Sequence, residues 1–528
     1  MINHQHRHIV CTEDSPIAVT DKGRVRGFIA DGIAAFRGIR YARAARFEPP
    51  VEMEAWEGVL DCMNYGYNCP NPAEHMGDNA VWDPGQVRYD AFTLARRYYP
   101  ENENCQYLNV WTPWESLGEK KPVMVWIHGG GYTGGSATEL DAYDGEELSR
   151  VGNVVAVSVT HRLNMFGYMN MADYGEKYAH SVNAGMLDLV AALKWVQKNI
   201  SSFGGDPDNV TIMGQSGGGG KVITLMQMPI ADGLYHKAII QSGVMEPSGH
   251  FAAHTQESTR RDAGDIMDRL GITKENIERV NEIPALQLVY AANAVSMEKT
   301  GRPFSMGWCP IEDELYVGNP LAVGFRKETA RVPLIVGSNL SEFIPSPRGG
   351  KARMPREAKE ALIAKRFGDK AREAEAAFGR AWPDLDVSYA ASMDGSVRSA
   401  VVRFCRERSR MAEAPVYNYV FAYESPFYGG WMPGHSGEIA FALHNAADGE
   451  TLWDGDISAR IQDEMAGSWA RFAWTGSPNG PLLPRWDAFT WADRACMVYE
   501  NRGSGTRVGD FDREIREMAK ATDQRLKK

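Results

Sequence analysis

A serine inside a glycine-rich pentapeptide is the strongest chemical signal in the sequence. The segment Gly214-Gln215-Ser216-Gly217-Gly218 fits the pattern G-x-S-x-G and directly follows the apolar run Val210–Met213. In so tight a strand-to-helix turn, side chains at the outer glycines would collide with backbone, and the serine hydroxyl is pushed out at a helix N-terminus, which favours developing negative charge. The pattern therefore predicts that Ser216 is a nucleophile. Taken alone, the pentapeptide also fits a glycine-rich turn that happens to contain a serine.

A second glycine run, His128-Gly129-Gly130-Gly131-Tyr132, follows the apolar run Val123–Ile127. Glycines at such a place let backbone N–H groups face a substrate oxygen without obstruction by side chains. We therefore predict an oxyanion hole formed by the N–H groups of Gly130, Gly131 and Gly217, the last being the residue after the nucleophile.

Phosphate binding is the rival interpretation of this run, because Gly129, Gly131 and Gly134 satisfy G-x-G-x-x-G after a predicted strand. A dinucleotide fingerprint should open a long apolar helix, and the segment Ser136–Asp141 does not look like one. The sequence also lacks the P-loop pattern G-x-x-x-x-G-K-[ST]. An HGGG run and a serine turn in one chain, in this order, favour acyl chemistry over nucleotide binding.

The elements that must position these residues are predicted to form an α/β sheet. Short apolar runs suit strands that are buried on both faces of a parallel sheet, and segments with helical spacing lie between them. The predicted strands are Ile17–Thr20, Val25–Ile29, Ala34–Ile39, Val123–Ile127, Val154–Val159, Val210–Met213, Ala238–Ile240, Leu334–Val336 and Pro415–Tyr423, and the predicted helices include Leu187–Ile200, Ile457–Trp474 and Phe511–Leu526. Strands alternating with helices indicate right-handed crossovers.

Two further stretches predict helical insertions on this sheet, at about residues 255–298 and 355–411. The second contains the charged segment Arg356–Phe378, which is predicted to be one helix. Because no repeat, low-complexity tract or linker interrupts the chain, we expect residues 1–528 to form a single elaborated domain.

The composition is that of a soluble globular protein. The 528 residues carry a formal net charge of −11, which argues against nucleic acid or an anionic membrane as the main partner, because phosphate binding needs clustered Lys and Arg. No run approaches the roughly 18 apolar residues of a membrane span, and no signal-peptide core opens the sequence. We therefore expect a cytoplasmic protein with reduced thiols, although a Cys69–Cys105 bridge stays open if the protein is exported by another route.

Agreement with a known family extends over almost the whole chain. Besides the two glycine motifs, the shared segments include Phe36-Arg37-Gly38-Ile39, Trp56-Glu57-Gly58-Val59, Asn104–Val110, Phe203–Pro207, Gln241-Ser242-Gly243 and Thr475–Asn479. On these segments the chain resembles the type B carboxylesterases of the cholinesterase-like α/β-hydrolase family, and it is similar in style to bacterial para-nitrobenzyl esterases. The resemblance implies an α/β-hydrolase fold, with a large, mostly parallel central sheet flanked by helices and carrying helical insertions.

The resemblance also selects the other two members of a catalytic triad. Glu342 matches the family's acid, which lies just past a strand, and His435 matches the family's histidine in the pattern His-x-x-Glu. Sequence alone leaves Asp313 as a rival acid and His444 as a rival base. Ser242 matches a family serine that supports the triad from behind, and core packing is its alternative role.

This triad implies a serine carboxylic ester hydrolase that acts through an acyl-enzyme on small to medium, apolar or aromatic esters. It needs no metal or organic cofactor. The expected partner is a small ester rather than nucleic acid, and the expected state is a monomer or homodimer. The alternatives are an acyltransferase or amidase that uses the same triad, and a non-catalytic cholinesterase-like binding protein.

The chain departs from the family pattern on both sides of the nucleophile. Gln215 replaces a glutamate that is usual in the family, which removes a buried charge and can alter the pKa of the base. Gly217 replaces a usual alanine and adds backbone freedom at the helix start. The residues predicted to line the substrate site are Tyr132, Gln215, Trp82, Trp308, Phe343 and Trp431, and simple burial is the alternative for Tyr132, Trp308, Phe343 and Trp431. Trp82 matches the aromatic residue with which cholinesterases hold choline by cation–π attraction, and a gorge wall or simple packing is its other interpretation.

Overall fold

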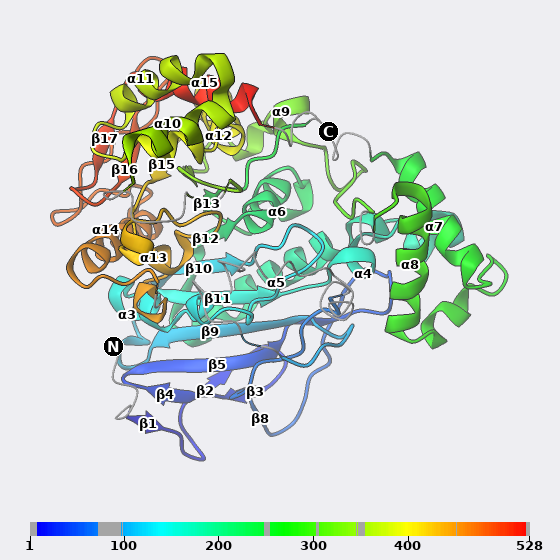
Figure 1. Cartoon of the computed structure of the whole chain (residues 1–528). Coiled ribbons are helices and arrows are strands. Elements are labelled where there is room, and N and C mark those ends of the chain that lie inside the picture. The colour runs from blue at the N-terminus through cyan, green and yellow to red at the C-terminus, as the bar shows by residue number, and fades with distance from the viewer. Residues whose placement is uncertain are drawn as a thin grey trace.

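A large twisted sheet forms the centre of the computed structural model, with helices on both of its faces (Figure 1). The structure describes residues 8–71, 97, 99–247, 254–302, 306–344, 346, 354–449 and 451–523. Within these residues the main sheet has 12 strands in the order β1-β4-β5-β9-β11-β10-β12-β13-β14-β15-β16-β17. The strands from β11 to β16 pair in parallel and the outer strands pair antiparallel, so the large and mostly parallel sheet of the sequence prediction is present.

The strand bounds follow the apolar runs closely in the centre of the sheet. The main-sheet strands are β1 Ile9–Val10, β4 Phe28–Ala30, β5 Ile33–Arg40, β9 Tyr107–Pro113, β10 Lys121–Ile127, β11 Val155–Thr160, β12 Gly205–Gln215, β13 Lys237–Gln241, β14 Leu334–Asn339, β15 Val416–Phe421, β16 Cys496–Tyr499 and β17 Gly505–Arg507. Two small sheets accompany it, built from β2 Ile17–Val19, β3 Arg24–Arg26 and β8 Val59–Asp61, and from β6 Ala42–Arg43 and β7 Val51–Glu52.

Helices cover the sheet and build the insertions. Their bounds are α3 Glu146–Gly152, α4 Asn164–Tyr168, α5 Ala184–Asn199, α6 Gly217–Met226, α7 Gln256–Arg269, α8 Ala285–Thr300, α9 Pro320–Val323, α10 Arg356–Phe367, α11 Ala371–Ala381, α12 Ser396–Met411, α13 Ile439–Ala442, α14 Asp456–Thr475 and α15 Arg513–Ala521. Helices α7 and α8 lie together at one end of the molecule, and α10, α11 and α15 cluster at another (Figure 1). Helices α7 and α8 fall within the first predicted insertion, and α10, α11 and α12 fall within the second. The single-domain interpretation stays a prediction.

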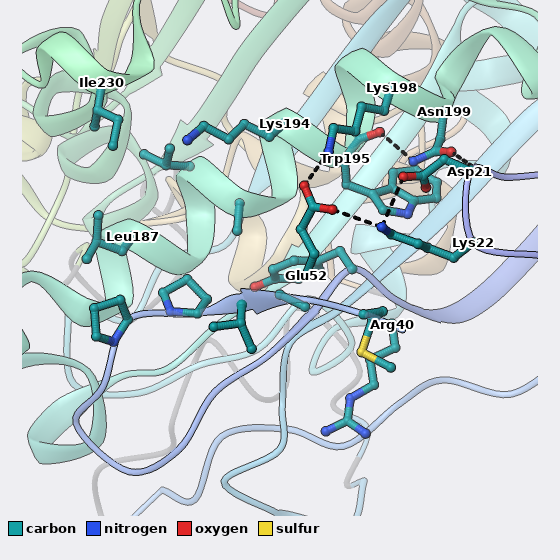
Figure 2. A pocket seen from close by; sticks show the side chains of 18 of the residues that line it. Asp21, Lys22, Arg40, Glu52, Leu187, Lys194, Trp195, Lys198, Asn199 and Ile230 are labelled. Atoms are coloured by element: carbon teal, nitrogen blue, oxygen red, sulfur yellow. Dashed lines mark hydrogen bonds and ion pairs between the residues drawn. The ribbon is translucent and has the colours of Figure 1, made fainter. Parts of the chain in front are cut away.

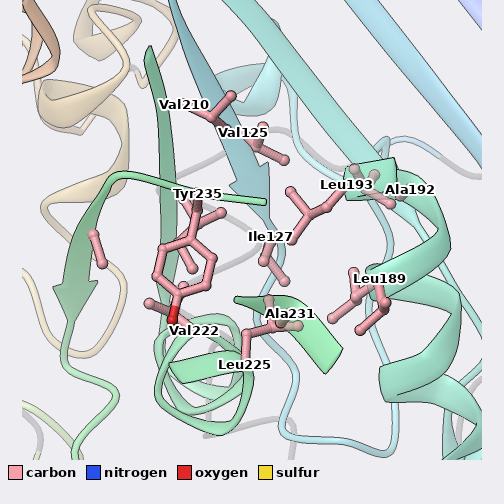
Figure 3. Packing of buried hydrophobic residues seen from close by; sticks show 14 of the residues in the cluster. Val125, Ile127, Leu189, Ala192, Leu193, Val210, Val222, Leu225, Ala231 and Tyr235 are labelled. Atoms are coloured by element: carbon pink, nitrogen blue, oxygen red, sulfur yellow. The ribbon is translucent and has the colours of Figure 1, made fainter. Parts of the chain in front are cut away.

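Strand β10 shows why the central strands are apolar throughout. Its alternate residues point to opposite faces of the sheet. On one face, Val125 and Ile127 join the cluster that includes side chains of α5 and α6, as Figure 3 shows with Leu193 and Val222. On the other face, Met124 and Trp126 pack in a separate cluster with residues of α3 and α14. Burial on both faces holds β10 in place, and β10 leads directly into the HGGG run.

Two expectations about single elements are wrong. The segment Val25–Ile29 is not one strand, because β3 and β4 belong to different sheets and separate at Gly27, where a Cβ would overlap the carbonyl of Ala35. The segment Arg356–Phe378 is not one helix, because α10 ends at Phe367. Gly368 then takes φ 57° and ψ −129°, and α11 begins at Ala371. A backbone with these angles suits glycine and cannot continue a helix.

The remaining expectations concern cysteines and membranes. Cys69 and Cys105 are both buried, and both are free thiols. In the residues that the structure describes, no helix is long and apolar enough to cross a membrane.

Candidate active site

The G-x-S-x-G segment forms a sharp turn between β12 and α6. Ser216 takes φ 56° and ψ −126°, which is an unusual backbone conformation for a residue with a side chain. The turn is fixed by the Ser216 N–H, which donates to the Gln241 carbonyl on β13 at 2.7 Å. Cβ atoms at Gly214 and Gly218 would overlap the carbonyl of Ile127, so both glycines are sterically required. The hydroxyl therefore stands at the N-terminus of α6, half-buried.

Three residues from separate parts of the chain meet at this hydroxyl. The Nε2 atom of His435 lies 2.7 Å from the Oγ atom of Ser216, and its Nδ1 atom lies 2.6 Å from Oε2 of Glu342. Glu342 follows β14, and His435 lies in the segment between β15 and α13. The His435 N–H also donates to the Glu342 carbonyl at 2.8 Å, which ties the two loops together. The structure thus brings the three predicted triad residues into one hydrogen-bonded chain.

The carboxylate of Glu342 is held on its far side as well. Its Oε1 accepts a hydrogen bond from Ser242 Oγ at 2.7 Å and from the Asn339 N–H at 2.8 Å. The side chain of Glu342 is completely buried, so these donors replace the water that a carboxylate needs. Ser242 therefore touches the triad through Glu342, as the resemblance implies.

The electrostatics favour a basic imidazole at His435. Burial alone lowers its pKa, but the hydrogen bond and charge of Glu342, with the charges of Glu438 and Asp394, raise the pKa above its ordinary value. Glu438 is itself buried, and burial together with the nearby charge of Glu342 raises its pKa to about 7. Its Oε2 accepts from Asn339 Nδ2 at 2.8 Å. Glu342 therefore binds His435 directly, and Glu438 acts on the same imidazole through its charge.

The HGGG run lies against the nucleophile. A Cβ atom on Gly129 would come 3.5 Å from the Ser216 Cβ, and one on Gly217 would overlap the backbone of Gly131. Gly130 and Gly131 have φ of 81° and 63°, in the left-handed region that favours glycine. Among the described residues, the N–H groups of Gly130, Gly131 and Gly217 donate to no other backbone or side-chain atom. Their role as the oxyanion hole stays a prediction.

Two more residues predicted to meet a substrate lie beside the imidazole. Gln215 is buried; its Nε2 is 3.5 Å from His435 Nε2, and its Oε1 accepts from Ser436 Oγ at 3.2 Å. Phe343 is 52% exposed, and its ring centre lies 4.2 Å from that of His435. It therefore offers an aromatic surface at the edge of the triad.

Of the other predicted substrate residues, three are buried or half-buried, and one is not described. Tyr132 is buried, and its hydroxyl lies 3.1 Å from Thr224 Oγ1. Trp431 is buried in the cluster on the α14 face of the sheet. Trp308 is half-buried between two other clusters. Trp82 lies outside the described residues. The roles of these four residues in substrate binding stay predictions.

The rival acid and base are engaged elsewhere. Asp313 accepts from His180, with 3.3 Å between Oδ2 and Nδ1, and His444 Nε2 lies 2.8 Å from Asp463 Oδ1. Neither pair includes the nucleophile.

A separate pocket of about 270 Å³ lies between α5 and the β6–β7 pair (Figure 2). Its walls include Trp56 and Trp195, and Lys22 reaches across it to Glu52 at 2.9 Å. Neither the triad nor the predicted oxyanion glycines line it, so this pocket is not part of the site described above.

Sequence reasoning missed several residues that shape the site. Asn339 was not singled out, although it holds both Glu342 and Glu438. Glu438 is the last residue of the His-x-x-Glu pattern, and the pattern alone gives it no role. Lys221 is a buried lysine that directly follows the glycine run Gly217–Gly220. A basic residue inside an otherwise apolar helix is the sequence signal that could have identified it.

A mostly parallel sheet that presents a serine at a strand-to-helix turn, next to an acid and a histidine from later loops, defines the class of α/β-hydrolases. Comparison with known proteins gives the family. The model of the carboxylesterase family matches residues 14–381. This chain belongs to the carboxylesterase family, and it is a carboxylic ester hydrolase.

Relatives of known activity and structure are similar over nearly the whole chain. A para-nitrobenzyl esterase of Bacillus subtilis is 28% identical over 92% of this chain and 95% of its own length. A phenmedipham hydrolase of Pseudarthrobacter oxydans is 32% identical over 93% of this chain and 96% of its own. The solved structure of an esterase from Clostridium hathewayi, described as able to hydrolyse aliphatic aromatic polyesters, is 36% identical, with a TM-score of 0.88 over 98% of this chain and 100% of that one.

Proposed function

We propose that ester hydrolysis in this protein proceeds through an acyl-enzyme on Ser216. His435 accepts the proton of the serine as Oγ attacks the ester carbonyl, and then donates it to the leaving alcohol. Glu342 orients the imidazole and stabilises the imidazolium. The N–H groups of Gly130, Gly131 and Gly217 bind the tetrahedral oxyanion. Water then attacks the acyl-enzyme by the same proton path.

One observation carries this proposal. The separations of 2.7 Å from Ser216 Oγ to His435 Nε2 and 2.6 Å from His435 Nδ1 to Glu342 Oε2 form a continuous chain of hydrogen bonds, in which His435 can take the serine proton while Glu342 stays ionised. The half-buried hydroxyl leaves the reacting atom open on one side, while the carboxylate is completely buried. The adjacent imidazole raises the nucleophilicity of the serine, and the carboxylate orients that imidazole.

A fluorophosphonate probe tests the mechanism directly. We expect the probe to add to Ser216 in the folded protein, as identified by peptide mass spectrometry. Ser216→Ala should lose both the adduct and the esterase activity, with an unchanged melting temperature. Thr224→Ser, a small change on the same helix, serves as the control. An adduct on another residue, or activity that survives in Ser216→Ala, would refute the proposal.

For the substrate we propose small to medium esters with an apolar or aromatic part. Exposed Phe343, stacked 4.2 Å from the imidazole, supports an aromatic contact next to the reacting carbonyl. The esterase from Clostridium hathewayi, described as able to hydrolyse aliphatic aromatic polyesters, supports the aromatic part of this proposal.

A panel of phenyl and ethyl esters with acyl chains of increasing length tests this class. Phe343→Leu should raise KM for phenyl esters more than for ethyl esters of the same acid. Equal changes for both alcohols would contradict the aromatic contact.

The cytoplasmic location and the monomeric or homodimeric state also stay proposals, to be tested by cell fractionation and light scattering.

A further inference from the structure

A buried lysine lies one turn into α6, behind the HGGG run. The side chain of Lys221 is fully buried, and its Nζ donates to the His128 carbonyl at 3.1 Å and approaches the Gly129 carbonyl at 3.5 Å. Both carbonyls belong to the first residues of the run. No step of the proposed hydrolysis uses this amine.

The position of Lys221 is energetically costly. Burial of an ammonium group is unfavourable, and a cation in the first turns of a helix opposes the helix dipole. Burial lowers the pKa of Lys221 to about 7, and the charge of Glu139, which raises it, offsets only part of this effect. A methionine of similar length would fill the same space without this cost. The lysine is therefore better explained by what its N–H groups bind than by packing.

Two histidine rings whose charges interact with the Lys221 amine lie close to one another. His128 and His161 are both buried, with 4.8 Å between their ring centres. Burial first, and then the charge of Lys221, keep the pKa of each imidazole below its ordinary value. The Nδ1 atom of His128 lies 3.0 Å from the Gly129 carbonyl. Two groups, the amine of Lys221 and the ring of His128, therefore contact the carbonyl of Gly129.

A carbonyl group that is held in place also sets the direction of the N–H group of the next residue. In a planar trans peptide, a C=O and the N–H of the next residue point in opposite directions. A Gly129 carbonyl held toward Lys221 therefore directs the Gly130 N–H away from Lys221. The same rule applies one residue later, because the Gly130 carbonyl accepts from the Gly134 N–H at 3.0 Å and so directs the Gly131 N–H to the opposite side.

We propose that Lys221 is a positioning residue that fixes the direction of the Gly130 N–H by holding the carbonyl groups of His128 and Gly129. Helical side chains lean toward the helix N-terminus, which carries the lysine back toward β10. The residues Gly217–Gly220 have no side chains to block its path. A lysine keeps N–H donors whether its amine is charged or neutral, so the role holds in both states. The inference rests on the proposed function, because it assigns an effect on the oxyanion hole of that same site.

Lys221→Met tests the role, because methionine keeps the length and removes the donors. We expect kcat to fall about 10- to 100-fold with little change in KM, since loss of a whole oxyanion donor costs about 10²–10³ in rate and a misdirected one costs less. The affinity for a trifluoromethyl ketone, whose adduct with a serine carries an oxyanion, should fall by a similar factor.

Lys121→Met is the matched control. Lys121 is also a fully buried lysine that donates to a backbone carbonyl, that of Ser116, but it lies at the opposite end of β10 from the HGGG run. The control should lower the melting temperature and leave kcat and the ketone affinity unchanged. If Lys221→Met behaves like the control, the lysine has only a structural role and the inference is overturned.

Two further measurements keep the test decisive. Lys221→Gln keeps a polar end but stops one bond short of Nζ, so it also loses the direct contact at 3.1 Å and serves if the methionine variant does not fold. An unchanged kcat and ketone affinity in folded Lys221→Gln would count against the inference in the same way. Fluorophosphonate labelling of Ser216 in the wild-type protein distinguishes the proposed function from the role of Lys221. Absence of the label refutes the proposed function. A normal label, together with an unchanged kcat in the Lys221 variants, refutes only the role of the lysine.

Discussion

At Gly217, a hydrogen atom in place of a methyl group decides how closely the oxyanion loop approaches the nucleophile. A Cβ at this position would overlap the backbone of Gly131, so the alanine that is usual in the family does not fit this chain without movement of the loop. Glycine at position 217 therefore lets the backbone of Gly131 lie closer to residue 217 than an alanine would allow.

Gly217→Ala should displace the HGGG run and lower kcat. We expect a fall of about 10- to 100-fold, because two of the three predicted oxyanion donors lie on the atoms that must move. Steady-state kinetics and affinity for the trifluoromethyl ketone measure the effect. Gly264→Ala, which places a methyl group in open space on α7, is the control and should leave kcat unchanged. A fully active Gly217→Ala would show that the loop adjusts without cost.

The pH dependence of the rate also belongs to single residues. The pKa of His435 is raised, because Glu342, Glu438 and Asp394 together outweigh the effect of burial. Hydrolysis needs the neutral imidazole, so activity is present above this pKa and is lost as pH falls through it. The acid limb should therefore lie above the ordinary histidine value of about 6.5.

Glu438→Gln should shift this acid limb to lower pH. The substitution removes a negative charge that stabilises the imidazolium, while the contact with Asn339 can be kept by the amide. The shift is smaller than a full charge would give, because the pKa of Glu438 is itself raised to about 7 and the group is partly protonated near neutrality. Profiles of kcat/KM between about pH 5 and 9 measure it. Glu54→Gln at the surface is the control, and an acid limb that stays in place in Glu438→Gln would contradict the assignment.

At the scale of elements, the contact between β14 and β15 sets the position of the acid. Gly337 lies on β14, and a Cβ there would overlap the ring of Tyr419 on the neighbouring strand. This close approach holds β14 against β15, and Glu342 follows the end of β14 by three residues. Packing between strands thus controls a catalytic distance.

Gly337→Ala should therefore harm both stability and activity. Overpacking in a core costs about 1–3 kcal/mol, and the strand must shift to relieve it. We expect a lower melting temperature together with a lower kcat, because Glu342 moves with the strand. Gly264→Ala is again a suitable comparison, since alanine in a helix interior gains about 0.5–1 kcal/mol over glycine where space allows. A loss of stability with an unchanged kcat would mean that Glu342 keeps its position when β14 shifts.

Elements with a strong local pattern could be predicted from the sequence, and those that depend on distant contacts could not. Strands β10, β12 and β14 are apolar because both of their faces are buried, so their runs are visible in the sequence. The sequence does not predict the break at Gly368, because the residues on both sides have a helical composition. Only the backbone angles of Gly368 show where α10 ends. Glu342 and His435 came from the family resemblance, since nothing local distinguishes them from their rivals. The contact of Lys221 with the HGGG run depends on how α6 packs beside β10, which no local pattern encodes.

At the scale of the whole molecule, the chain carries a formal net charge of −11. A negative protein attracts cations and repels anions over distances of about one Debye length, which is about 10 Å at 0.1 M salt. The catalytic groups themselves distinguish esters by shape and by the reacting carbonyl. Long-range charge acts instead on the rate of encounter, so it should appear in kcat/KM and not in kcat.

Salt should therefore change kcat/KM in opposite directions for charged esters. Between about 10 mM and 0.3 M salt, we expect kcat/KM to fall about 2- to 10-fold for a cationic ester and to rise for an anionic one, because screening removes the attraction in the first case and the repulsion in the second. A neutral ester with the same acyl group controls for effects of salt on the chemistry and should change little. If all three esters respond alike, the net charge does not steer substrates, and discrimination between them lies in the contacts around Ser216 alone.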